Sequence, residues 1–307
     1  MAAAFRDPQM NLVPTQDFRV HHRLRQLGPV MAAVVATALS FVLFFIIRQW
    51  ERRNLQAELQ AIVQQRLELL RESLGDSLES LHSLGAFYET GLPVDRERFR
   101  RFVTGTLARR PEIQAFTWTP KVPANERAAY EAAARAEGFP DFQFTKRDPA
   151  TGHMMRAPAQ PEFYYPVYYV EPLDRNRPAF GFDLNARIET LGLARDQARA
   201  VATPLIRLMQ EKSNEPGFIV YLPLYRGPPP ATVEARRAAN TGFVATVFRL
   251  PDLVDPTLAR LPGVHVVLRD SNQASPNNAY VLPDADNSPA WRKLAAYTLN
   301  LPVAGRE

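Results

Sequence analysis

The stretch FYYPVYYVEP, residues 163–172, holds four of the ten tyrosines in this chain of 307 residues. Aromatic and β-branched residues at such density favour β-strands. Two roles fit such a strand, because aromatic strands form ordinary hydrophobic core and also line the mostly apolar pockets that receive small molecules. Composition alone favours core, so the interpretation depends on the residues around this stretch.

The flanking sequence alternates between helix-like and strand-like segments. Runs rich in aromatic and β-branched residues predict strands at residues 113–120, 141–147, 179–184, 217–225, 242–250, 264–270, 278–283 and 296–305. Capping residues and apolar periodicity predict helices at residues 95–110, 125–138, 185–200 and 251–261. Helices mixed with antiparallel-looking hairpins predict an α+β fold. The prolines at positions 228–230 mark a boundary between two lobes.

An uncharged segment near the amino end predicts a membrane span. Residues 28–47 read GPVMAAVVATALSFVLFFII, and as a helix they reach about 30 Å, the thickness of the hydrocarbon core. Charged residues follow where a signal peptide would have its small-residue cleavage site. We therefore expect a retained anchor.

The residues after the span predict one long helix, continuous with it, over 48–91. No proline occurs between Pro29 and Pro93, and apolar residues recur at steps of three and four from Leu55 to Phe87. Such a stripe either packs on its own domain or forms the seam of a parallel dimer, although Arg66 and Gly75 interrupt its spacing. We expect a homodimer through this helix, with packing on its own domain as the alternative.

Several chemistries lack support in the sequence. There is no cysteine, the five histidines have no metal-ligand spacing, and no nucleophile elbow or phosphate-cradling glycine motif occurs. Four carboxylates remain as candidates for acid–base work, namely Glu171, Asp174, Asp183 and Glu211, but single charges beside turns are more often solvated. The net charge of +5 is scattered among acidic neighbours. We expect no catalytic residue, metal, cofactor or nucleic-acid partner.

Five motifs in order resemble the CHASE domain family. They are FYYPVYYVEPLDRN, GFDL, ATPLIRLMQE, GFIVYLPLYRG and GFVATVFRLPDLV, and the likeness covers about residues 84–269. This family comprises extracytoplasmic sensor domains of bacterial histidine kinases and diguanylate cyclases and of plant cytokinin receptors. The resemblance implies a cytoplasmic tail (1–27), the span (28–47), a stalk helix (48–91), a membrane-distal PAS-like ligand lobe (92–227) and a membrane-proximal PAS-like lobe (228–307).

The resemblance also implies a ligand site in the distal lobe. Five residues match wall positions of the plant receptors' pocket: Tyr169, Val170, Met209, Tyr221 and Phe243. Arg187 stands near the place of an aspartate that hydrogen-bonds adenine in those receptors, and Tyr221 and Thr246 replace smaller residues. We therefore expect a small-molecule ligand other than cytokinin. Arg187 and Arg207 favour one that bears a carboxylate or phosphate, whereas Thr203 is expected to cap a short helix.

The predicted function is a sensor in the inner membrane whose ligand lobe lies in the periplasm. Family members return to the membrane and carry an output module, whereas this chain stops at LPVAGRE. We expect either a fragment whose second span and output enzyme lie beyond residue 307 or a gene product that has lost its output. Two alternatives stay open: a periplasmic enzyme tethered by the anchor, using an acid such as Asp183, and a structural adaptor that assembles through the long helix.

Overall fold

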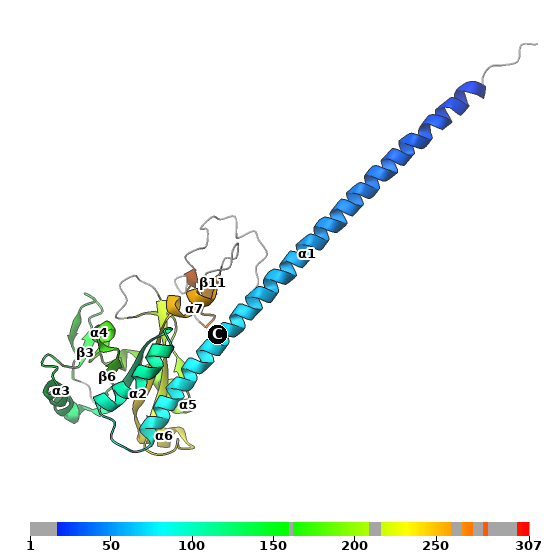
Figure 1. Ribbon diagram of the computed structural model, residues 1–307. Helices are drawn as coiled ribbons and strands as arrows, with labels where there is room; N and C mark the ends of the chain where they lie inside the picture. Colours follow the sequence, from blue (N-terminus) through cyan, green and yellow to red (C-terminus); the bar gives the residue numbers. More distant parts are fainter. Residues whose placement is uncertain are drawn as a thin grey trace, which may run out of the picture. The chain divides into compact units, whose positions relative to one another are not determined.

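The computed structural model describes residues 17–159, 162–208, 216–258, 266–272, 279–281 and 300–306. The chain divides into two compact units, Met1–Val63 and Gln64–Glu307. Helix α1 (Asp17–Glu89) contains the boundary between them (Figure 1). The two units are described separately.

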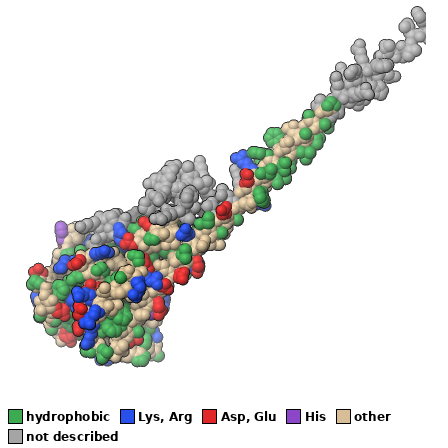
Figure 2. Space-filling view, viewed as in Figure 1, with side chains coloured by type: hydrophobic (Ala, Val, Ile, Leu, Met, Phe, Trp, Pro, Cys, Tyr) green, Lys and Arg blue, Asp and Glu red, His purple; other side chains and the backbone are tan. Residues whose placement is uncertain are grey.

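The first unit contributes an apolar stretch of α1. Residues Met31–Glu51 have a mean hydropathy of 2.3 and are the part of the described chain that is long and apolar enough to cross a membrane. This window overlaps the predicted span at 28–47. Its large side chains are exposed in the isolated chain, for example Phe41 at 60% and Phe45 at 67%, and Figure 2 shows hydrophobic side chains along the visible face of this part of the helix. Lipid tails would cover such a surface.

The second unit is built on one antiparallel sheet with strand order β6-β1-β10-β9-β7, and β8 pairs with β9. The strands are β6 (Tyr169–Glu171), β1 (Ile113–Pro120), β10 (Asn240–Arg249), β9 (Pro216–Tyr225), β7 (Val201–Ala202) and β8 (Ile206–Arg207). The long strands β9 and β10 are buried on both faces, which explains their near-continuous apolar sequences. Helices and an antiparallel sheet in one unit confirm the α+β prediction.

Strand β10 corrects the predicted lobe boundary. It follows the three prolines at 228–230 and was expected in the second lobe, yet it lies between β1 and β9, at the centre of the sheet. Strand pairing joins segments far apart in sequence, so a turn signal does not show which sheet the next strand enters. Strands of the segment 92–227 and β10 therefore belong to one sheet.

Helices cover one face of this sheet. The carboxyl-terminal part of α1, together with α2 (Arg96–Arg109) and α7 (Leu250–Leu258), packs on the face that carries Phe116, Val220 and Val244. Helices α1 and α2 lie side by side (Figure 1), and the rings of Phe87 and Phe102 stack between them at 4.7 Å.

The apolar stripe of α1 is largely used by this packing. Leu70, Leu74, Leu81 and Leu84 are at most 3% exposed, and they belong to the core of their own chain. The alternative expectation, that the stripe packs on its own domain, thus holds for residues 70–84. A dimer seam formed by these four leucines is excluded, because their surface is already buried.

The stretch 163–172 does not form one strand. Residues Phe163–Tyr164 form β5, which pairs with β2 (Val122–Pro123), and Tyr169–Glu171 form β6, which pairs with β1. Pro166 lies between them and has no N–H group to continue a ladder, so the run breaks into two short strands.

Smaller elements complete the second unit. The strand expected at 179–184 is replaced by 3₁₀ turns and isolated bridges, and the residues at 300–306 contain a single bridge, Val303 to Arg306, in place of a strand. The remaining elements are α3 (Arg127–Ala136), β3 (Thr145–Arg147), β4 (Met154–Arg156), α4 (Leu173–Asn176), α5 (Ile188–Gln197), α6 (Val233–Ala239), β11 (Val267–Arg269), β12 (Ala279–Val281) and the 3₁₀ turns η1 (Ala124–Glu126), η2 (Arg177–Ala179) and η3 (Leu184–Arg187).

Candidate functional site

A small cavity lies on the face of the sheet opposite α1. Its volume is about 40 Å³. The sheet contributes Val170 of β6, Thr117 of β1 and Tyr221 of β9, and the strand registers place these residues in one row across the sheet, with Ala245 of β10 between Thr117 and Tyr221. The roof comes mainly from the segment between β6 and β8, through Ala179, Phe182, Leu184 and Arg187, and is completed by Val167 before β6 and Leu208 after β8.

The alternation of side chains along each strand sorts residues between this cavity and the helix-covered face. On β1, Ala115 and Thr117 line the cavity, whereas Phe116 belongs to the core under the helices. On β9, Tyr221 lines the cavity and Val220 faces the helices. Successive residues of a strand point to opposite faces, so the pattern follows from the strand assignment.

The roof is held by a short network of backbone bonds around Asp183. The N–H groups of Val167 and Leu184 donate to the carbonyl oxygens of Phe182 and Tyr165 at 2.9 Å each. Asp183 is 3% exposed, and its Oδ1 accepts from the Tyr165 N–H at 2.9 Å. Burial raises the pKa of Asp183, although these hydrogen bonds favour its charged form. Asp183 is therefore an anchor of the roof, which gives the acid proposed for a tethered enzyme a structural role.

Gly181 is required in the roof for a steric reason. Its φ is +83°, and a Cβ atom at this position would stand 2.5 Å from the backbone oxygen of Gln143. No other residue adopts this conformation so close to a neighbouring backbone without displacing it. The motif GFDL thus combines a glycine that passes close to the Gln143 backbone with Asp183, which holds the roof by hydrogen bonds.

Two polar groups in the cavity lack partners among the described residues. Tyr221 is 1% exposed, and its Oη makes no hydrogen bond there. Burial raises the pKa of Tyr221 to about 12, partly offset by the nearby Arg187 guanidinium. Arg187 is half-buried at the end of η3, and it forms no ion pair with any residue that the structure describes. A third polar residue, Asn176, is used structurally, since its Nδ2 donates to Pro172 O at 2.8 Å.

The structure brings together three of the six predicted ligand residues. Val170, Tyr221 and Arg187 line the cavity. Phe243 lies on the same face, with its ring centroid 6.5 Å from that of Tyr221, but it belongs to the neighbouring core and does not line the cavity. Met209 lies outside the described residues.

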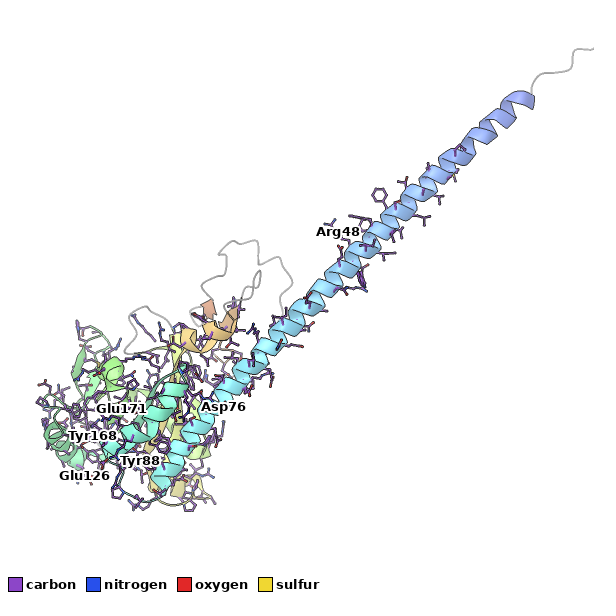
Figure 3. All side chains as sticks on the ribbon, viewed as in Figure 1. Arg48, Asp76, Tyr88, Glu126, Tyr168 and Glu171 are labelled. Carbon is purple, nitrogen blue, oxygen red and sulfur yellow. The ribbon has the colours of Figure 1, made fainter. Side chains whose placement is uncertain are left out.

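Tyr169 is on the opposite face of the sheet, so the expectation that it lines the cavity is wrong. Adjacent strand residues point to opposite faces, and Val170 already faces the cavity. Tyr169 packs against Trp118 at 4.7 Å between ring centroids, and the Arg96 guanidinium lies 4.6 Å from its ring centroid. The same cluster contains Tyr168 and Tyr88 (Figure 3), and the Tyr88 ring stacks on Trp118 at 5.4 Å.

Two further expectations are corrected by the local structure. Arg207 is exposed on β8 and does not line the cavity. Thr203 does not cap a helix, because β8 follows it; its hydroxyl accepts from the Ile219 N–H at 3.1 Å and joins the β7 end to β9. Thr203 is thus architectural as expected, but through its hydrogen bond with Ile219 and not as a helix cap.

Thr117 and the roof residues Val167 and Phe182 were missed from sequence. The two-residue period of the strand at 113–120 would have placed Thr117 beside Ala115 on one face. No such signal exists for the roof, which is built from short helical turns and the loops between them. Glu171, one of the four carboxylates proposed for acid–base work, is the last residue of β6 (Figure 3). Within the described ranges, no group of three acidic or histidine side chains is arranged to hold a metal ion.

Comparison with known proteins adds a family match. The CHASE domain matches residues 93–280, more than half of the chain. Histidine kinase 2 of Arabidopsis thaliana is 24% identical over 217 residues, which cover 67% of this chain and 18% of that protein. A germination-specific adenylate cyclase of Dictyostelium discoideum is 25% identical over 160 residues, which cover 52% of this chain and 18% of that one. The chain thus spans about a fifth of the length of these relatives.

Among solved structures, the chain resembles the ligand-binding domain of PctC, an amino acid chemoreceptor of Pseudomonas aeruginosa PAO1, in complex with GABA. The TM-score is 0.35 at 12% identity, and the likeness covers 66% of each chain.

Proposed function

The chain belongs to the CHASE domain family of sensor domains, and on this premise we propose that it is the membrane-anchored receptor part of a signalling protein, binding a small molecule in the cavity between β1, β6, β9 and the roof. The observation that carries the proposal is the buried Tyr221 Oη, which has no partner among the described residues and belongs to a side chain that lines a mostly apolar cavity. Buried polar groups are nearly always hydrogen-bonded, so an unpartnered one on a cavity wall favours a ligand as its partner.

The ligand-bound form must be wider than this one. A cavity of about 40 Å³ holds a water molecule or two, whereas sites for small molecules typically measure about 300–1,000 Å³. The sheet side is restrained by its strand ladders, so we expect the roof segment 173–188 to move most and the strands to shift only slightly. A ligand that binds only the wider form shifts the equilibrium toward it, and this shift is the signal.

Strand β9 offers a route from the cavity to α1. Tyr221 lines the cavity, and the next residue, Leu222, packs against the helix-covered core that contains α1. A displacement of β9 at Tyr221 therefore changes the contact with α1. The same helix contains the apolar window Met31–Glu51, so we propose that α1 transmits the signal through the membrane.

We propose further that residues 1–27 are cytoplasmic and that the second unit lies in the periplasm. The output is a histidine kinase or a nucleotide cyclase, as the names of the two relatives indicate for those proteins. The segment after α7 is proposed to belong to a second, membrane-proximal lobe.

We propose a homodimer through α1 whose contact uses fewer positions than the whole apolar stripe from Leu55 to Phe87. Since Leu70, Leu74, Leu81 and Leu84 are buried in their own chain, the contact must use more amino-terminal or outward-facing positions such as Leu69, which is 45% exposed. The chain has no cysteine, so single cysteines placed from residue 60 to 72 report the seam by oxidative cross-linking in membranes. Cross-linking with helical periodicity supports the dimer, and uniform absence of cross-links refutes it.

Ligand binding is tested by thermal unfolding of the full chain in detergent against a metabolite library. A compound that binds the native state raises the unfolding midpoint with its concentration. The variant Ala115→Val fills part of the cavity and should abolish the rise. Thr246→Val should keep it, because Thr246 pairs with Phe116 and Val220 on the opposite face of the sheet. A rise that survives Ala115→Val places the ligand elsewhere and contradicts the proposed site.

A further inference from the structure

The charge on the described cavity lining is positive only. Arg187 is the single charged side chain among the described residues that line it, and no Asp or Glu is among them. Tyr221 adds a hydroxyl without a partner in the described chain. The described lining therefore presents one cation with no anion to balance it, beside the hydroxyl groups of Tyr221 and Thr117 and the structurally bonded Asn176 amide.

These donors define a ligand group. A guanidinium presents its N–H groups as a planar fork that matches a carboxylate, and a phenol hydroxyl donates one more bond. Both residues line the same small cavity, and the Arg187 charge partly offsets the effect of burial on the pKa of the Tyr221 phenol. An anionic group of two or three oxygens placed there satisfies both donors and neutralises the cation.

The rest of the lining defines the body of the ligand. Most of the other walls are apolar and come from Val167, Val170, Phe182, Leu184, Ile219 and Val247. A single arginine neutralises a single negative charge. The described walls offer no carboxylate for an ammonium group, and an unpaired charge in an apolar site is costly.

We propose that the ligand is a small monocarboxylate with an apolar body, held by Arg187 and Tyr221, and that the site discriminates against neutral amides, amino acids and dicarboxylates. This inference rests on the proposed function of the cavity as a ligand site. It adds the chemical class, which the family match does not supply.

The experiment uses the full chain in detergent at neutral pH and four probes with the same six-carbon body. Hexanoate is the monocarboxylate, hexanamide its neutral counterpart, 6-aminohexanoate the zwitterion and adipate the dianion. Binding is measured by calorimetry and by the unfolding midpoint. We expect hexanoate to bind at least about tenfold more tightly than each of the other three, because only hexanoate matches one buried cation in apolar walls.

Three variants assign the selectivity to residues. Arg187→Met should remove the preference for hexanoate over hexanamide without lowering the unfolding midpoint of the free protein, because an unpaired charge beside apolar walls is costly and its removal breaks no ion pair of the described residues. Tyr221→Phe should weaken hexanoate about three- to tenfold. Arg207→Gln, which changes an exposed residue of β8 outside the cavity, should bind like the parent chain.

The outcomes separate this inference from the proposed function. Equal binding of hexanoate and hexanamide, or an unchanged preference in Arg187→Met, overturns the monocarboxylate assignment. If library compounds of another class bind and Ala115→Val abolishes their binding, the cavity is still the ligand site and only its chemical class is wrong. If neither these probes nor any library compound shifts the midpoint, both proposals fail.

Discussion

Gly85 of α1 lies so close to Leu222 of β9 that a Cβ atom added at residue 85 would stand 2.7 Å from Leu222 Cδ2. Leu222 follows Tyr221, whose side chain lines the cavity on the other face of the sheet. One strand thus carries a wall of the site and a contact with the helix that leads to the apolar window. The contact is close because glycine has no side chain to hold the helix away.

This close approach predicts opposite effects for two glycines of α1. Gly75→Ala should raise the free energy of unfolding by up to about 1 kcal/mol, because alanine favours helix and no atom lies within 4 Å of the added Cβ. Gly85→Ala should not show this gain, because Leu222 must change its side-chain conformation. Chemical denaturation of the full chain in detergent measures both. Equal gains would contradict the contact.

A buried carboxylate joins α1 to the start of β1. Glu112 is 7% exposed, and its Oε1 accepts hydrogen bonds from Ser77 Oγ at 2.9 Å and Ser73 Oγ at 3.1 Å. Ser77→Ala should lower the free energy of unfolding by about 1–2 kcal/mol, because a bond to a charged group is lost from a buried site. Ser80→Ala is the control, since Ser80 Oγ donates to Asp76 O of its own helix. A similar loss in both variants would refute the role of Glu112.

Arg96 should resist replacement by lysine. Its guanidinium lies 4.6 Å from the ring centroid of Phe139 and 5.0 Å from that of Phe180, and its Nε donates to Glu137 at 2.8 Å. Lysine lacks the planar group that stacks on rings, so Arg96→Lys should cost about 1–2 kcal/mol of stability. Arg101→Lys, at a side chain that is 74% exposed, should change little. Equal unfolding midpoints for the two variants would contradict this.

Acid should weaken the contact between α5 and α6. Arg237 and Arg195 donate to the carboxylate of Asp196 and hold its pKa well below the ordinary value. A depressed pKa in the folded state contributes stability above the unfolded pKa of about 3.9, and this stability is lost as pH falls toward the folded pKa. Asp196→Asn should therefore show a shallower loss of thermal stability below about pH 4. Parallel curves for the two proteins would refute this assignment.

Local patterns predicted the long elements well. The strand expected at 113–120 is β1 with the same bounds, and those expected at 217–225 and 242–250 are β9 and β10 within two residues. The near-continuous apolar runs of β9 and β10 reflect burial on both faces of the sheet. Such a run predicts a strand whichever strands pair with it. The stretch 163–172 was harder, because Pro166 divides it between two partners.

The candidate site was predicted in part. Tyr221, Val170 and Arg187 line the cavity, but the sequence motif did not show which of two adjacent residues faces it, and Tyr169 was placed on the wrong side. That choice depends on the register of β6 against β1, where Thr117 pairs with Val170. A shift of one residue would exchange the two faces.

By itself the sequence determined the apolar helix, the α+β class and the long strands, because charge, periodicity and strand composition act over short segments. The tertiary structure alone decided that β10 lies between β1 and β9, that Leu70, Leu74, Leu81 and Leu84 of α1 pack on their own sheet, and that Arg187 and Tyr221 line one cavity. These relationships join segments far apart in the chain. They arise from the burial of one sheet between helices and roof, which no local pattern encodes.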